Sequence, residues 1–197
     1  MKLNPVIAID GYKVDHRRQY PDGTQLIFSN LTARGTRRTY TDKMVFFGLQ
    51  YFIKDFLIDS WNRDFFQKPK TEVIAAFERR INNYLGPNNV GTEHIAALHD
   101  LGYLPIKIMA LPEGTVYPLK VPCLVVYNTD ERFFWLTNYL ETILSANVWG
   151  MCTSATTAHQ YKKILTHYAA ETDGSKEFVN WQGHDFSFRG MFGVQAA

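Results

Sequence analysis

Three short apolar segments joined by tight turns constrain the fold of this chain most. Ile106–Ile108, Val116–Tyr117 and Leu124–Tyr127 have the composition of strands, and the links between them contain Pro112-Glu113-Gly114 and the stretch Pro118–Pro122. Links this short reverse the direction of a chain but cannot hold a crossover helix. We therefore expect antiparallel pairing among these strands.

Three further segments are predicted to be strands because they are short and apolar: Val6–Ile9, Leu26–Leu31 and Phe178–Trp181. Between the strands, apolar residues recur at the three- and four-residue spacing of helices, around residues 49–57, 73–85, 92–101, 136–148 and 161–169. The pattern predicts an α+β fold, with a mixed or antiparallel sheet and helices.

Residues typical of helix caps and helix ends mark where several of these helices begin or end. Gly86-Pro87 should end the second helix, and Gly102 should be the C-terminal cap of the third. Asp130 is placed to cap the fourth helix, and Thr153 or Ser154 to cap a separate fifth one.

Composition excludes several classes of function. The chain has 197 residues, 46% of them hydrophobic, and a net charge of +2, which favours neither nucleic acid nor an acidic membrane surface as a partner. Cys123 and Cys152 lie in apolar surroundings without metal-ligand spacing and are expected in the core. No apolar run has the length of a membrane span, and residues 1–5 lack the pattern of a signal peptide, so a cytoplasmic protein is expected.

The stretch His184–Gly190 concentrates chemically useful side chains near the end of the chain. Phe186 suits a flat aromatic ligand, and Arg189 suits an anionic group on that ligand. The alternative is the end of a buried strand, in which Phe186 and Phe188 are core residues and Arg189 pairs with Asp185.

A basic, glycine-containing loop runs from Arg34 to Arg38. It is a candidate anion site, although a solvated run of charges is the more common outcome for such a sequence.

Five motifs, in this order and at this spacing, resemble the nicotinamide phosphoribosyltransferase family. The resemblance extends from about residue 5 to residue 197 and is carried by Asp10–Pro21, Phe47–Tyr51, Pro112–Gly114, Trp135–Thr142 and His184–Gly190. Within the first motif, the family pattern is Asp10-x-Tyr12-Lys13-x-x-His16, followed by Gln19-Tyr20-Pro21.

The resemblance implies a role for six residues. Phe186 would stack on one face of the nicotinamide ring, and Tyr12 would cover the other face from the partner subunit of a homodimer. Arg34 would contact phosphate, also across the dimer interface. The other three line the pocket: Arg189 and Asp10 are implied as catalytic residues, and Asp185 as a substrate-binding residue.

The implied reaction is the attack of nicotinamide on C1 of phosphoribosyl pyrophosphate, with loss of pyrophosphate through an oxocarbenium-like state. The pyridine nitrogen is already nucleophilic, so no general base is required. Mg²⁺ would be carried on the phosphates of the substrate, so no metal site is expected in the protein. ATP, where the family uses it, would act through residues outside this chain.

The family has an N-terminal mixed domain followed by an irregular α/β barrel, and a barrel alone needs about 250 residues. We therefore expect residues 1–177 to form the N-terminal α+β domain and residues 178–197 to start an incomplete barrel. Such a chain should be inactive without a complementing chain that carries the barrel. Two alternatives remain open at this point: a nicotinate phosphoribosyltransferase, and a dimerising remnant without catalysis.

Overall fold

The structure, a computed structural model, describes residues 4–37, 39–172 and 174–190 and divides into two compact units. Unit 1 comprises residues 1–32, 49–110 and 122–146, and unit 2 comprises residues 33–48, 111–121 and 147–197. Each unit is assembled from three stretches of the chain, so residues far apart in sequence meet within it.

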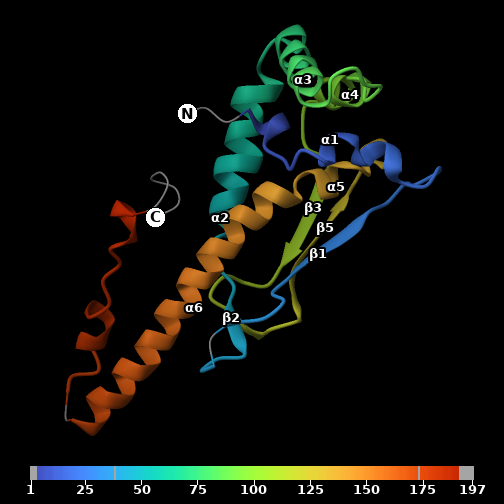
Figure 1. Cartoon of the computed structure of the whole chain (residues 1–197). Helices are drawn as coiled ribbons and strands as arrows, with labels where there is room; N and C mark the ends of the chain where they lie inside the picture. Colours follow the sequence, from blue (N-terminus) through green and yellow to red (C-terminus); the bar gives the residue numbers. More distant parts are fainter. Residues whose placement is uncertain (1–3, 38, 173, 191–197) are drawn as a thin grey trace. The chain divides into compact units, whose positions relative to one another are not determined.

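A three-stranded antiparallel sheet lies in unit 1, with β5 (Pro122–Asn128) between β1 (Phe28–Thr32) and β3 (Ile106–Ala110) (Figure 1). The antiparallel pairing predicted for the segments around 106–108 and 124–127 is confirmed. From Leu124 to Asn128 along β5, the buried residues Leu124, Val126 and Asn128 alternate with the less buried Val125 and Tyr127, as expected for a strand with one covered face.

The third predicted strand of this group belongs to a different sheet. β4 (Val116–Pro118) pairs antiparallel with β2 (Lys43–Val45) in a two-stranded sheet of unit 2. The short links would have allowed β4 to pair with its sequence neighbours β3 and β5. Its partner is instead β2, which lies far from it in the sequence.

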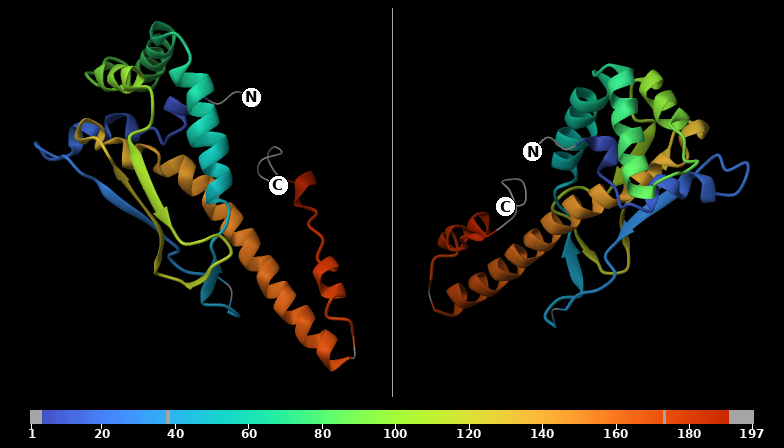
Figure 2. Two further views of the ribbon diagram at one scale, coloured as in Figure 1. Left: turned by 180° about the vertical axis from the view of Figure 1, so that it is seen from behind. Right: turned by 45° about the horizontal axis from the view of Figure 1, so that its top comes forward.

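Unit 1 has helices where the apolar periodicity predicted them, around residues 49–57, 73–85, 92–101 and 136–148, together with shorter helical elements that were not predicted. These helical elements are η1 (Pro5–Ile7), α1 (Lys13–His16), η2 (Arg17–Gln19), α2 (Leu49–Phe52), the π-helical η3 (Ile53–Ser60) and η4 (Asn62–Phe66), α3 (Lys70–Leu85), α4 (Glu93–Leu101), η5 (Glu131–Phe133) and α5 (Leu136–Tyr139). The helices α3 and α4 lie side by side (Figures 1 and 2). Gly86 and Gly102 end these two helices at φ values of 69° and 81°, so both predicted helix ends are confirmed. Asp130 accepts a hydrogen bond from the amide of Arg132 and caps the 3-10 helix η5, so the prediction that it caps the helix around residues 136–148 is wrong.

The strand predicted over Val6–Ile9 is wrong. Asn4 accepts a hydrogen bond from the amide of Val6 at 3.0 Å, and Pro5 occupies the first position of the 3-10 turn η1. Side-chain capping and the fixed φ of proline favour a helical turn here over an extended strand.

The predicted break before a separate fifth helix is also wrong, because α6 (Glu141–Glu171) is one continuous helix (Figure 2). Thr153 and Thr157 donate hydrogen bonds to carbonyl groups four residues earlier, of Trp149 and Thr153. The hydroxyl groups thus bond back inside the helix and cap no new N-terminus.

The strand predicted over Phe178–Trp181 is a 3-10 helix, η6, and Ser187–Arg189 forms a second one, η7. Ser175 accepts a hydrogen bond from the amide of Phe178, which suits a helical turn. Among the described residues, no strand lies beside this segment, and an apolar run of four residues does not by itself distinguish strand from helix. The barrel beginning at residue 178 therefore remains a prediction.

Candidate functional site

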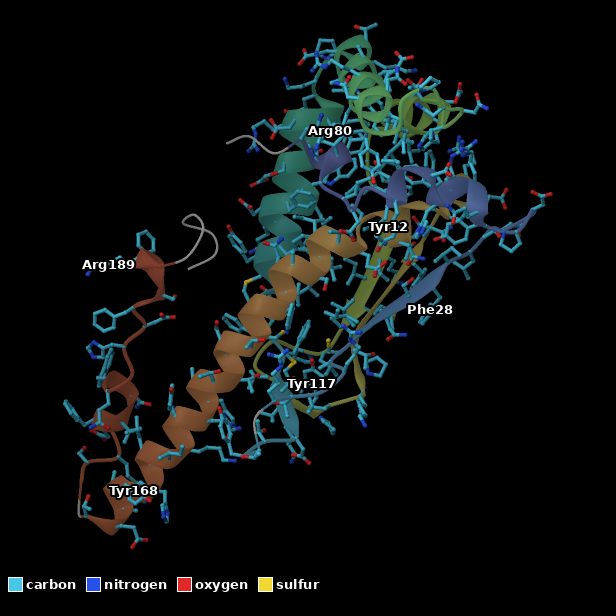
Figure 3. The ribbon with its side chains drawn as sticks, viewed as in Figure 1. Tyr12, Phe28, Arg80, Tyr117, Tyr168 and Arg189 are labelled. Atoms are coloured by element: carbon cyan, nitrogen blue, oxygen red, sulfur yellow. The ribbon has the colours of Figure 1, made fainter. Side chains whose placement is uncertain are left out.

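The segment that leads into α1 contains Tyr12, whose ring is largely exposed to solvent but is restrained by neighbouring side chains. Tyr12 is 56% exposed, and its hydroxyl donates a hydrogen bond to Oδ2 of Asp10 at 3.3 Å (Figure 3). The ring of His16 lies with its centroid 5.0 Å away and tilted by 58°. Thr142, in the first turn of α6, donates to the same Oδ2 atom at 2.7 Å and accepts from the backbone amide of Asp10 at 3.2 Å.

A buried cation lies directly behind this tyrosine. The side chain of Lys13 is only 2% exposed, and its Nζ is 2.6 Å from Oε2 of Glu141 and 5.2 Å from the centroid of the Tyr12 ring. Glu141 is the neighbour of Thr142 in α6, so two consecutive residues of this helix hold two residues of the N-terminal segment.

The sequence motifs predicted Asp10 and Tyr12 as site residues but assigned nothing to Lys13, Glu141 or Thr142. All three lie inside the motifs Asp10–Pro21 and Trp135–Thr142, so the signal was present. The sequence did not show that the two motifs, separated by 132 residues between Asp10 and Thr142, contact each other.

The C-terminal stretch of unit 2 presents its side chains to solvent. Phe186 is 81% exposed, and Arg189 is exposed near the end of the described chain (Figure 3). Asp185 accepts a hydrogen bond from the backbone amide of Ser187 at 2.7 Å, which lowers the pKa of the Asp185 carboxyl below its ordinary value. Within the described stretch, no ion pair joins Asp185 to Arg189, so the buried strand end considered from the sequence is wrong for these residues.

Arg34 lies in an exposed loop of unit 2. The carbonyl of its neighbour Ala33 accepts a hydrogen bond at 2.9 Å from the amide of Lys120, a residue with a φ of 64°. The loop is thus anchored at its base while the guanidinium group of Arg34 is free to meet solvent or an anion.

Phe47 and Gly114, from the motifs Phe47–Tyr51 and Pro112–Gly114, take part in backbone hydrogen bonds that hold unit 2 together. The amide of Gly114 donates to the carbonyl of Phe46 at 2.8 Å. The amides of Val45 and Phe47 donate to Oγ1 of Thr156 and to Sγ of Cys152, which lie one turn apart on α6. The side chains of Cys123 and Cys152 are both buried, as predicted.

The predicted site residues fall into two groups. Asp10 and Tyr12 contact each other in unit 1, whereas Arg34, Asp185, Phe186 and Arg189 belong to unit 2. The described residues contain no group of three His, Cys, Asp or Glu side chains able to hold a metal ion. Nor do they include a helix long and apolar enough to cross a membrane.

Comparison with known proteins decides the family. Residues 4–108 match the model of the nicotinamide phosphoribosyltransferase N-terminal domain, which is more than half of the 197 residues. The chain belongs to the nicotinamide phosphoribosyltransferase family. It is 53% identical over its whole length to the nicotinamide phosphoribosyltransferase of Acinetobacter baylyi, and 32% identical over 99% of its length to that of Mycoplasma genitalium.

This member of the nicotinamide phosphoribosyltransferase family spans 40% and 46%, respectively, of the lengths of those two relatives. The crystal structure of human nicotinic acid phosphoribosyltransferase aligns with 79% of the chain, with a TM-score of 0.52 and 20% identity. At that identity the likeness supports the fold alone. The observed mixture of helices and antiparallel sheet agrees with the predicted α+β class.

Proposed function

We propose that this chain takes part in the transfer of a phosphoribosyl group to nicotinamide, which yields nicotinamide mononucleotide and pyrophosphate. The observation that carries the proposal is the 53% identity, over the whole chain, to a relative named nicotinamide phosphoribosyltransferase. The exposed, restrained ring of Tyr12 supports it, because a reaction between a flat ring and a sugar depends on how the ring is oriented.

In this proposal Tyr12 and Phe186 are the two faces of the ring site. Both side chains are largely exposed, so each can offer a ring face to nicotinamide. We place them in one site through a homodimer, with Tyr12 coming from one copy and Phe186 from the other. Stacking is worth about 0.5–1.5 kcal/mol per aromatic pair beyond the area buried.

The charged residues have separate tasks. Arg189 and Arg34 bind phosphate oxygens of phosphoribosyl pyrophosphate, because a guanidinium fork matches their geometry. Asp10 faces the positive charge that develops as the pyridine nitrogen bonds to C1. Mg²⁺ enters with the substrate and neutralises its pyrophosphate, and the use of ATP remains a prediction that concerns residues outside this chain.

Product formation from nicotinamide, phosphoribosyl pyrophosphate and Mg²⁺ tests the proposal. The chain should be assayed alone and together with the remaining segment of the Acinetobacter baylyi relative, of which it spans 40%. We expect nicotinamide mononucleotide only from the mixture, because phosphate loops and barrel are expected in that segment. Nicotinate as a parallel substrate separates the amide from the acid activity. A mixture that assembles without forming either product would favour a dimerising protein without catalysis.

Variants of the active mixture test the ring site. Tyr12→Ala and Phe186→Ala should each raise KM for nicotinamide, whereas Tyr12→Phe should have a small effect because the ring remains. Tyr103→Ala is the matched control, since Tyr103 is 55% exposed and lies outside the motifs. An unchanged KM for Tyr12→Ala would remove Tyr12 from the site.

Variants of the arginines test the phosphate contacts. Arg34→Ala and Arg189→Ala should raise KM for phosphoribosyl pyrophosphate more than KM for nicotinamide. Arg80→Ala, on the exposed side of α3, should change neither constant (Figure 3). If all three arginine variants changed KM for both substrates equally, the effect would be one of general electrostatics and would contradict a phosphate site.

A further inference from the structure

We infer that Thr142, Lys13 and Glu141 are positioning residues that hold the Tyr12 ring ready for a flat heterocyclic ligand. This inference rests on the proposed function and names residues that the resemblance did not assign. Its geometry lies entirely within unit 1, where the N-terminal segment meets the first turn of α6.

The first positioning residue, Lys13, buries its ammonium group. Burial of an ammonium group costs several kcal/mol, and an ion pair in such a place contributes little net stability compared with apolar packing. A lysine present only for solubility would be exposed, but this side chain is 2% exposed while its partner Glu141 is 60% exposed. The pair therefore fixes a geometry, and the ring within its reach is that of Tyr12, 5.2 Å from Nζ.

The second positioning residue is Thr142, in the first turn of α6. Its hydroxyl group accepts from the backbone amide of Asp10 and donates to Oδ2 of the same residue. That Oδ2 atom is also the acceptor for the hydroxyl of Tyr12. One threonine thus sets both the backbone and the carboxylate to which Tyr12 is bound.

Fixing an exposed aromatic side chain in one rotamer has a free-energy cost. An exposed tyrosine in solution samples several rotamers, and its ordering on binding reduces affinity. Here Asp10 holds the phenol, Lys13 lies over the ring and His16 lies beside it, while more than half of the side chain stays open to solvent. The restraints are in place before any ligand arrives, which is the arrangement expected of a preorganised stacking platform.

The experiment compares Thr142→Val, which removes the hydroxyl at nearly constant volume, with Thr142→Ser, which keeps it. Tyr12 is observed in the 197-residue chain by ¹⁹F NMR of 3-fluorotyrosine, with the resonance assigned by Tyr12→Phe. Thr142→Val should shift or broaden this resonance, and Thr142→Ser should leave it near its parental position. Thr153→Val is the control, since its hydroxyl donates to the carbonyl of Trp149 within α6.

The second measurement is made in the active mixture. Thr142→Val and Lys13→Met should raise KM for nicotinamide by roughly three- to tenfold, the range expected for the loss of one hydrogen bond. The values of kcat and of KM for phosphoribosyl pyrophosphate should stay within about twofold, and Thr142→Ser should restore the parental KM. A purely structural role would instead lower kcat through loss of folded protein and leave KM unchanged.

The two measurements separate the inference from the proposed function. If the mixture makes no product, the fluorine spectra still report whether Thr142 orders Tyr12. An unaltered Tyr12 resonance in Thr142→Val would overturn the inference. A shift or broadening in Thr142→Ser as large as that in Thr142→Val would overturn it too, because serine keeps the hydroxyl.

Discussion

His94 should make the stability of this chain depend on pH in a direction that the structure fixes. The residue is buried in α4, with the rings of Phe77 and Trp135 edge-on at centroid distances of 5.8 Å and 5.0 Å. Burial, with a smaller contribution from the positive charge of Arg17, lowers the pKa of His94 from 6.5 to about 3. No described residue bonds to its Nδ1, so nothing compensates the imidazolium form.

The magnitude follows from the difference between the folded and unfolded states. The unfolded chain binds a proton at His94 below pH 6.5, whereas the folded chain resists it down to about pH 3. Within this window the unfolded state carries more protons, so the free energy of unfolding falls as the pH falls. The slope is about 1.4 kcal/mol per pH unit well inside the window, and the loss between pH 7 and pH 5 is about 2 kcal/mol.

Urea unfolding at pH 7, pH 6 and pH 5 measures this effect in the parent chain and in His94→Leu. The variant should lose about 2 kcal/mol less than the parent between pH 7 and pH 5, whatever its stability at pH 7. His167→Gln, at an exposed position of α6, is the control and should follow the parent. If His94→Leu shows the same pH dependence as the parent, the burial argument for His94 is refuted.

Two further predictions concern stability. Gly48 has a φ of 96°, and a methyl group there would overlap the side chain of Met151, so Gly48→Ala should lower the free energy of unfolding by roughly 1–3 kcal/mol. Gly35→Ala, which meets open space, is its control, and equal urea midpoints for the two variants would contradict the prediction. Tyr139→Phe should cost roughly 1–3 kcal/mol, because the buried carbonyl of Val6 loses the hydroxyl that donates to it at 2.5 Å. Urea unfolding measures this loss, and an unchanged midpoint would mean that another group satisfies the carbonyl.

The helices with complete local signals could be predicted from the sequence. In α3 the apolar residues Val73, Phe77 and Ile81 recur every four residues and are buried, and Gly86 ends the helix. Spacing and cap are both properties of neighbouring residues, so a single sequence contains them.

The errors arose where two local signals compete. Asn4-Pro5 before an apolar run fits both a strand start and a capped turn, and the cap prevailed. Thr153 inside a helix resembles an N-terminal cap in sequence, but its hydroxyl can equally bond to the carbonyl of Trp149. Which alternative prevails depends on the packing of the flanking residues, which no short window of sequence contains.

For the candidate site, the sequence identified several residues but did not show which of them contact one another. The residues Asp10 and Tyr12 were predicted through a family motif, and Glu141 and Thr142 were part of another motif that received no role. The structure joins the two motifs through Asp10–Thr142 and Lys13–Glu141, contacts across 132 and 128 residues of chain. Closing so long a loop carries an entropic cost that local sequence cannot reveal.

That pairing changes what the first turn of α6 is expected to do. A helix end that only packed on the sheet would present apolar side chains, yet its first two residues are a glutamate and a threonine directed at the tyrosine segment. The same helix continues to Thr156, which bonds to Val45 of β2, and to Cys152, which bonds to Phe47, so α6 supports both the Tyr12 platform and the fold of unit 2. The N-terminal end of α6 is therefore the place where substitutions should alter ligand affinity separately from stability, and the middle of the helix is where they should alter stability alone.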